Sequence, residues 1–122
     1  MIYTKSPDEI IGMRNACRFA AEVLNAVGKN IAPGITTKEL EQVATNKIKS
    51  LGAKSAFFGY RGYPGIICAS VNEVVIHGIP SQQKLKEGDI VGIDVGVKHN
   101  GFYGDTARTF AVGKISQDAE KL

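Results

Sequence analysis

The sequence predicts an α+β fold in which two N-terminal helices pack on an antiparallel sheet with a long C-terminal hairpin. Apolar residues recur at helical spacing in the first part of the chain, and from Ala53 onward short apolar runs alternate with glycine-rich turns. Two strand-like segments then flank His99-Asn100-Gly101, where Asn-Gly is typical of a two-residue hairpin loop. Helices followed by antiparallel strands indicate a layered domain, with the helices on one face of the sheet.

Both helices carry clear start signals. Ser6-Pro7-Asp8-Glu9 places an N-cap residue, a proline and two acids at the start of the first helix, which is expected to end near residues 31–34. Thr36 and Glu39 have the spacing of a capping box, which opens the second helix. Gly52 is expected to end that helix, because glycine readily takes the left-handed conformation after a C-terminus.

Strands are predicted at Phe57-Phe58 and at residues 66–71, separated by the glycine-rich loop of residues 59–65. A short apolar run at residues 74–76 is interpreted as a strand that ends at His77. The long hairpin follows at about residues 89–98 and 101–112. Residues 116–122 begin another helix.

Two carboxylates in the hairpin form the most informative pattern of the chain. A two-residue loop pairs positions whose numbers sum to an odd value, so Asp94 and Asp105 share one face of the ribbon. Asp94 stands between Gly92 and Gly96, which predicts an open floor beside it, while the alternate valines and isoleucine of this strand point to the other face. Two such carboxylates repel each other unless a cation lies between them, and hard oxygen ligands suit a divalent metal.

A structural interpretation of these acids must be weighed against the metal hypothesis. Aspartates that flank a hairpin are most often solvated turn formers, and this is the interpretation favoured for Asp89. Asp94 fits it poorly, because it lies mid-strand in an apolar stretch where an unpaired carboxylate is costly. The residues alone therefore favour a metal or catalytic role for the pair only slightly.

Other candidate residues lie before the hairpin. His77 enters a loop, where functional side chains are common, although a lone histidine is more often a structural residue. Tyr60 and Tyr63 could wall a pocket with amphipathic rings, or pack in an ordinary surface loop. Cys68 could line the same pocket, although burial in a core is the commoner fate of a cysteine.

Composition excludes several classes of protein. The net charge of +3 is small and the lysines are scattered, so we expect no specific nucleic-acid partner. The sequence shows no apolar segment of a secretory signal and no run of membrane-spanning length, which predicts a cytoplasmic protein without a membrane partner. Two distant cysteines without CxxC spacing are expected to be reduced there.

Taken together, the segments that contain these candidates closely resemble the type I methionine aminopeptidases. The resemblance runs from Ser6 to the last residue and rests on five segments in the family's order, which are residues 59–64, 68–73, 75–80, 88–96 and 104–109. They include Asn-Glu followed by His-Gly-Ile-Pro, and Asp followed by Gly-Asp-Thr. These motifs, in this order and spacing, are highly specific.

The resemblance implies a function and a role for each matching residue. The reaction is the metal-dependent removal of N-terminal methionine from nascent polypeptides, with two divalent ions (Co, Mn, Fe or Zn) as cofactors. Asp94 would bind one metal ion and Asp105 would bridge both. His77 would be catalytic, facing the substrate and shuttling a proton. The residues implied to contact the methionine or the scissile bond are Phe57, Tyr60, Tyr63, Cys68 and His77.

Two positions depart from the family's pattern. Some members carry cysteine where Phe57 stands, and others carry threonine where Gly96 stands. We expect these differences to change the shape of the pocket and the hydrogen bonds around Asp94.

The resemblance also predicts that the chain is one half of a larger fold. The pita-bread (creatinase/aminopeptidase) fold has two pseudosymmetric halves, and residues 1–122 form a single domain that matches the N-terminal half. The family's other metal ligands, one histidine and two glutamates, come from the second half. The isolated chain is therefore expected to bind metal weakly or not at all and to be weakly active or inactive, because tight sites use three or more protein ligands. Its expected partner is the missing C-terminal half or a second copy of itself. The alternative is a non-catalytic binding or assembly module that self-associates.

Overall fold

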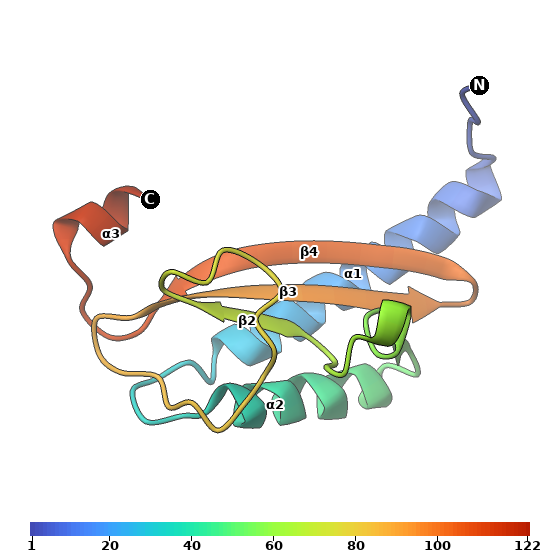
Figure 1. The fold of residues 1–122 in the computed structure, drawn as a ribbon. Coiled ribbons are helices and arrows are strands. Elements are labelled where there is room, and N and C mark those ends of the chain that lie inside the picture. The colour runs from blue at the N-terminus through green and yellow to red at the C-terminus, as the bar shows by residue number, and fades with distance from the viewer.

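Two helices cover one face of a four-stranded antiparallel sheet in the computed structural model, which describes residues 1–122 (Figure 1). The elements follow in the order α1 (Pro7–Gly28), α2 (Thr37–Ser50), β1 (Lys54–Ser55), a 3-10 turn η1 (Tyr60–Gly62), β2 (Cys68–Val71), β3 (Ile90–His99), β4 (Phe102–Ala111) and α3 (Gln117–Lys121). This arrangement confirms the predicted α+β fold. None of the helices has the length and apolar character that crossing a bilayer requires.

Side-chain caps fix where the two long helices begin. The Glu9 backbone N–H donates to the Ser6 hydroxyl (3.2 Å), and the Glu9 carboxylate accepts from the Ser6 backbone N–H (2.7 Å). Thr36 and Glu39 form the same reciprocal pair at the start of α2, as predicted. Helix α1 ends earlier than predicted, at Gly28, because the Asn30 side chain donates to the Ala26 carbonyl (2.8 Å) and satisfies the last turn.

Strand β3 is the centre of the sheet. It pairs with β4 along its whole length, and its other edge pairs with β2 and β1, where Cys68 lies opposite Asp94. Asn100 and Gly101 both have positive φ angles (50° and 82°), the requirement of a type I′ turn. The predicted hairpin is confirmed, with strand bounds within one residue of those expected.

The hydrophobic core lies between this sheet and the two helices. Alternate β3 residues point toward α1 and α2 and are fully buried, namely Val91, Ile93, Val95 and Val97. Their helix partners in the core include Val23, Val27 and Leu40. Because side chains alternate along a strand, burial of this set turns Asp94 and its neighbouring glycines to the opposite, outer face.

The backbone of helix α1 comes close to the backbone of β4 at Gly104. A Cβ atom at Gly104 would lie 2.3 Å from the Ala16 carbonyl oxygen, which is far inside van der Waals contact. Aromatic rings fill the corresponding spaces at two glycines of the helix, with Phe102 against Gly12 and Phe110 against Gly28. Close contact between the helix and the strand therefore requires the absence of a side chain at residue 104.

Two predicted strands are wrong. Phe57 and Phe58 lie beyond the two-residue strand β1, because both of their backbone N–H groups donate to the Ser55 hydroxyl (3.2 and 3.3 Å) and turn the chain. Residues 74–76 form no strand, and Val75 and Ile76 are 87% and 63% exposed. The strand predicted over residues 66–71 is shorter than expected, since β2 covers only its last four residues.

A polar clamp holds the two ends of the segment between β2 and β3. The Asn72 side chain donates to Asp89 (3.0 Å) and accepts from the Ile90 backbone N–H (3.1 Å). The second Asp89 oxygen accepts from the Lys86 backbone N–H (2.9 Å). Asp89 is thus a turn former, as expected, and it also anchors the segment that carries His77.

Asp89→Ala is expected to lower the free energy of unfolding by about 1 kcal/mol at neutral pH, the size of a typical lost hydrogen bond. The Asn72 side chain and the Lys86 backbone N–H lower the pKa of Asp89, so the unfolded chain binds this proton more readily than the folded chain. The stabilisation is therefore present above the unfolded pKa and is lost as the pH falls through the folded pKa. Urea unfolding across acidic pH should show the two proteins converging; a constant difference would contradict this assignment.

Candidate metal and substrate site

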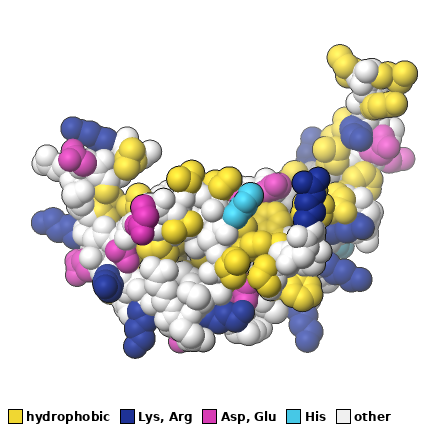
Figure 2. Space-filling model, viewed as in Figure 1, with side chains coloured by type: hydrophobic (Ala, Val, Ile, Leu, Met, Phe, Trp, Pro, Cys, Tyr) yellow, Lys and Arg dark blue, Asp and Glu magenta, His cyan; other side chains and the backbone are white.

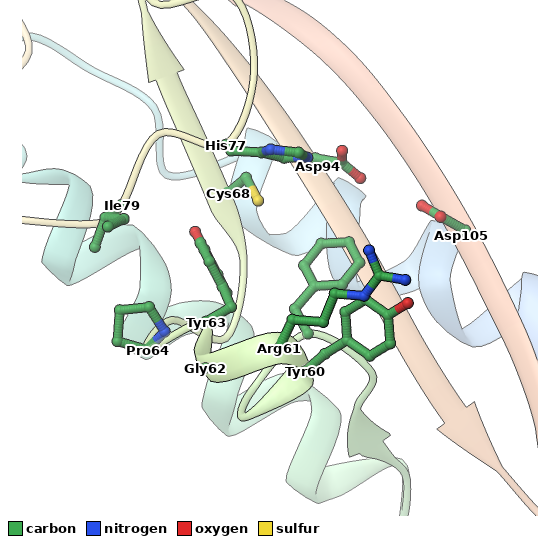
Figure 3. A pocket seen from close by; sticks show the side chains of 11 residues that line it. Tyr60, Arg61, Gly62, Tyr63, Pro64, Cys68, His77, Ile79, Asp94 and Asp105 are labelled. Atoms are coloured by element: carbon green, nitrogen blue, oxygen red, sulfur yellow. The ribbon is translucent and has the colours of Figure 1, made fainter.

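A cavity of about 660 Å³ opens on the outer face of the sheet and collects all of the predicted site residues. The loop after β1, strand β2, the segment before β3 and the long hairpin each contribute side chains (Figure 3). In Figure 2 a histidine lies beside an acidic side chain and near hydrophobic ones, in the hollow of the molecule. The predicted residues in the cavity wall are Phe57, Tyr60, Tyr63, Cys68, His77, Asp94 and Asp105.

Strand register brings the two carboxylates together. Asp94 on β3 lies opposite Ala107, and Asp105 on β4 lies opposite Gly96. The two acids are therefore diagonal neighbours on the same face of the hairpin, as predicted from the odd-sum rule. Both line the cavity.

Asp94 has a buried and electrostatically unfavourable carboxylate. Its Oδ1 atom is buried and has no hydrogen-bond partner. Burial raises the pKa of Asp94, and the neighbouring Asp105 carboxylate raises it further, while His77 lowers it. An unpaired buried carboxylate oxygen is costly, so a divalent cation between the two acids would relieve both burial and repulsion.

The cavity offers carboxylate oxygens, which are the type of ligand that a hard divalent metal prefers, but it offers few of them. No group of three or more histidine, cysteine, aspartate or glutamate side chains comes together in the chain. Asp94 and Asp105 are the carboxylates that line the cavity. Tight protein metal sites use three or more ligands, so these two carboxylates are fewer than such a site needs.

His77 is held by its neighbour Gly78 rather than by a strand. The Gly78 backbone N–H donates to the Ser70 hydroxyl (3.0 Å), and its carbonyl accepts from the Ala69 backbone N–H (2.9 Å). A Cβ atom at Gly78 would lie 2.2 Å from the Ala69 oxygen, so only glycine fits against β2. His77 itself has a φ of 59°, which corrects its predicted place at a strand end, and Figure 3 shows its ring beside Asp94.

Tyr63 and Cys68 form an uncharged part of the wall, in which Cys68 is buried and Tyr63 is half-buried. The Tyr63 hydroxyl lies 2.9 Å from the Ile67 carbonyl and 3.2 Å from the Gly78 carbonyl, and donates to one of them at a time. Burial strongly raises the pKa of Tyr63, and Cys68 beside it adds to this shift. Burial also raises the pKa of the Cys68 thiol, against the lowering effect of Tyr63. Both groups therefore stay protonated at neutral pH and present uncharged surface to the cavity.

Phe57 and Gly96, the two departures from the family's pattern, are in direct contact. A Cβ atom at Gly96 would lie 2.4 Å from the Phe57 ring. The open floor predicted beside Asp94 is therefore filled on the Gly96 side, and that prediction is wrong there. On the Gly92 side a built Cβ would be in ordinary van der Waals contact, with its nearest atom 3.8 Å away, so a small side chain would fit there without collision. A large ring at residue 57 requires the absence of a side chain at residue 96.

We expect Gly96→Thr alone to lower the free energy of unfolding by about 1–3 kcal/mol, because the new side chain collides with the Phe57 ring. Phe57→Cys in the same chain should recover much of this loss by vacating the space. Urea unfolding of the wild type, both single variants and the double variant gives the coupling energy. Additive effects of the two substitutions would contradict a direct contact.

Sequence reasoning assigned no role to Arg61, Gly62, Pro64 and Ile79, which also line the cavity. All four lie within or beside the motif segments, and their place among the site residues was the only available signal. Arg61 is the one cation among the residues that line this cavity, besides the titratable His77.

The fold of the chain is that of a class of metallopeptidases. The model of metallopeptidase family M24 matches residues 11–122. The chain therefore belongs to metallopeptidase family M24, whose pita-bread fold it shares, and the resemblance seen in the sequence is confirmed.

Individual relatives agree with this assignment. Methionine aminopeptidase 1 of Bacillus subtilis is 51% identical over 122 residues, which cover 100% of this chain and 49% of that protein. The methionine aminopeptidase of Escherichia coli is 48% identical over 123 residues, covering 99% and 47%. The chain thus spans about half the length of the curated relatives that it matches.

Solved structures show the same relation. The crystal structure of methionine aminopeptidase from Rickettsia prowazekii superposes with a TM-score of 0.97 at 42% identity, covering 100% of this chain and 49% of that one. Prolidase from Pyrococcus furiosus shares the fold alone, with a TM-score of 0.83 at 24% identity, covering 96% and 33%.

Proposed function

We propose that this chain provides part of the active site of a methionyl aminopeptidase, which removes N-terminal methionine from nascent polypeptides. The observation that carries the proposal is the carboxylate pair of Asp94 and Asp105, with an unsatisfied buried oxygen, inside a cavity that also holds His77 and aromatic walls. The identity to methionine aminopeptidases over the whole chain supports it.

In this proposal Asp94 and Asp105 hold divalent metal ions. When bound, such ions lower the pKa of water and polarise a carbonyl group, which is the chemistry that peptide hydrolysis needs. The remaining ligands come from polypeptide other than residues 1–122 or from a second copy of the chain. Binding of metal by the isolated chain is accordingly weak.

His77 acts on the substrate in this proposal. Its left-handed backbone and the clamp of Gly78 on Ser70 fix the imidazole at the cavity wall beside Asp94. From there the ring can donate a hydrogen bond to the scissile peptide and carry a proton to the leaving amine, because a neutral histidine both accepts and donates.

The walls of the cavity suit a methionine side chain. Phe57, Tyr60 and Tyr63 present aromatic surface, and Cys68 adds an uncharged thiol. A flexible, polarisable thioether packs well against aromatic rings. With divalent ions held by the carboxylates, an open coordination position would receive the free α-amino group of the peptide, which would account for action at the N-terminus alone.

A second candidate is a non-catalytic binding or assembly module on the same scaffold, which self-associates. The observation that favours it is the small donor set, since only two carboxylates of this chain line the cavity. The intact His77 beside them favours the enzymatic proposal, because a binding module has no need of a proton carrier next to paired acids.

Calorimetric titration of the chain with Mn²⁺ or Co²⁺, with its mass in solution measured in parallel, tests these proposals. Weak binding by a monomer that is lost when the carboxylates are replaced supports a contribution of two ligands. Tight binding of about two ions by a dimer would place the remaining ligands on the second copy. Binding that survives replacement of both Asp94 and Asp105 would overturn the proposed site.

A further inference from the structure

Glu41 is a buried acid that has no part in the proposed chemistry. It lies on α2 beside Leu40 and Ala44 of the hydrophobic core, and its side chain is only 8% exposed. A carboxylate buried at such a place is costly unless polar or charged groups satisfy it. The Lys38 ammonium lies 2.6 Å from one Glu41 oxygen, and the Ile66 backbone N–H donates to the other (2.9 Å). The second contact links the helix to the segment that builds the cavity wall.

Ile66 attaches the glycine-rich loop of the cavity to two other elements. The turn of η1, earlier in this loop, closes through hydrogen bonds between its own residues. The peptide groups of Ile66 are instead bonded to residues outside the loop. Its N–H donates to Glu41 on α2, and its carbonyl accepts from the Ser55 hydroxyl at the end of β1 (2.9 Å). Helix α2 and strand β1 therefore hold the same residue, directly after the loop.

The Tyr63 ring packs on the segment that Ile66 anchors. A Cβ atom built at Gly65 would lie 3.0 Å from Cε1 of Tyr63 and 3.1 Å from Oε2 of Glu41, so ring and carboxylate share the space beside this glycine. The Tyr63 hydroxyl lies 2.9 Å from the carbonyl of Ile67, the residue after the anchor. Figure 3 shows Tyr63 extending from the loop toward the side of the cavity that holds Cys68. Movement of the anchored segment would therefore displace this part of the wall.

We infer that Glu41 is a positioning residue, which fixes Tyr63 in the cavity wall by holding the Ile66 N–H. The description of this wall as the surface for a methionine side chain rests on the proposed function, whereas the anchoring does not. Without the carboxylate the Ile66 N–H loses its partner, and the segment is held from one side only. A wall that is fixed in advance favours binding, because the ligand does not have to order it.

The central comparison is between Glu41→Gln and Glu41→Met, two side chains of similar length that both suit a helix. Glutamine keeps an oxygen acceptor for the Ile66 N–H, whereas methionine fills the space and offers only a weak thioether acceptor. In NMR spectra of the 122-residue chain, the Ile66 amide and the Tyr63 ring report the position of the wall. We expect both signals to stay close to the wild type in Glu41→Gln and to shift and broaden in Glu41→Met. The amides of the β3–β4 hairpin should keep their positions in both variants.

L-Methionine amide, titrated without added metal, is the probe for the substrate wall. We expect Glu41→Met to bind it about two- to tenfold more weakly than the wild type, which corresponds to ordering about one side chain on binding. Glu41→Gln should bind it as the wild type does, because the wall remains fixed.

Two control variants separate positioning from other effects of the substitution. Lys38→Met removes the ion pair and keeps the carboxylate, so the Tyr63 signals and probe binding should not change. Val23→Ala removes apolar volume from the fully buried face of α1 and lowers stability without touching the loop, and it should also leave both unchanged. If Glu41→Met does not fold, slow hydrogen exchange of the Ile66 amide in the wild type tests the same bond.

Three results would overturn the inference. They are unchanged Tyr63 signals in Glu41→Met, an equal response of Glu41→Gln and Glu41→Met, and fast exchange of the Ile66 amide in the wild type. A wild-type chain that binds no L-methionine amide would instead overturn the proposed substrate wall, and the Tyr63 signals would still decide whether Glu41 fixes this residue.

Discussion

Asp105→Asn is expected to abolish specific binding of divalent metal at the cavity. Asparagine keeps the shape of the side chain and removes the negative charge, so a cation loses one of its two charged ligands while Asp94 remains. Loss of a charged ligand from so small a set should weaken affinity at least about 10- to 100-fold, more than the loss of a supporting residue. Paramagnetic Mn²⁺ gives the measurement, because it should broaden the amide resonances around Gly96 and Asp105 in the wild type and spare them in the variant.

Two control variants make this result specific. Asp118→Asn changes an exposed acid on α3, outside the cavity, and should leave the broadening unchanged. His77→Ala should also retain it, because we propose that His77 carries a proton and does not bind metal. Equal broadening in wild type and Asp105→Asn would refute the ligand assignment, and loss of the effect in His77→Ala would make the histidine a ligand.

Gly104→Ala is expected to lower the free energy of unfolding by about 2–3 kcal/mol, the upper part of the range for an overpacked core. The added methyl group would lie 2.3 Å from the Ala16 carbonyl oxygen, and this oxygen belongs to the helix backbone and cannot rotate away. Helix α1 must then move off β4 and loosen the packing of Val23 and Val27 behind it. Equilibrium unfolding in urea measures the loss, provided that the slope of the unfolding free energy against urea concentration is the same in both proteins.

Gly92→Ala is the matched control in the same sheet. Its Cβ would face the outer side of the sheet in ordinary van der Waals contact, with no atom nearer than 3.8 Å, and its φ lies outside the left-handed region. We expect stability equal to the wild type or slightly higher, because alanine restricts the unfolded chain more than glycine does. A Gly104→Ala protein as stable as Gly92→Ala would show that the helix adjusts freely.

Sequence patterns a few residues long predicted the helix starts and the hairpin turn, because neighbouring residues determine these features. Ser6 and Thr36 each cap a helix through a residue three positions away, and Asn100-Gly101 determines its own turn. The wrong strand predictions fall where contacts between distant residues determine the backbone conformation. The Ser55 hydroxyl accepts from Phe57 and Phe58 because it is held against the Ile66 carbonyl, eleven positions along the chain. No apolar pattern contains that information.

The same distinction applies to the site. The shared face of Asp94 and Asp105 followed from counting across a tight turn, and the structure places them so. The contact between Phe57 and Gly96 joins residues far apart in sequence, and only their separate departures from the family's pattern marked them. The place of Arg61 in the cavity wall could not be found by either route, because an arginine in a glycine-rich loop has no local signature of a role.

The type I′ hairpin also bears on the order in which the molecule folds. Asp94 and Asp105 are joined by about a dozen residues, whereas Phe57 meets Gly96 across about forty, and closing the longer loop costs about 1 kcal/mol more. Local hairpins form in microseconds, earlier than contacts between distant segments. The two acids are thus brought together while both are still hydrated, when their repulsion is weak. We expect dehydration of Asp94 to follow when the segment that carries Phe57, Tyr60 and Tyr63 packs against a hairpin that already holds the pair in place.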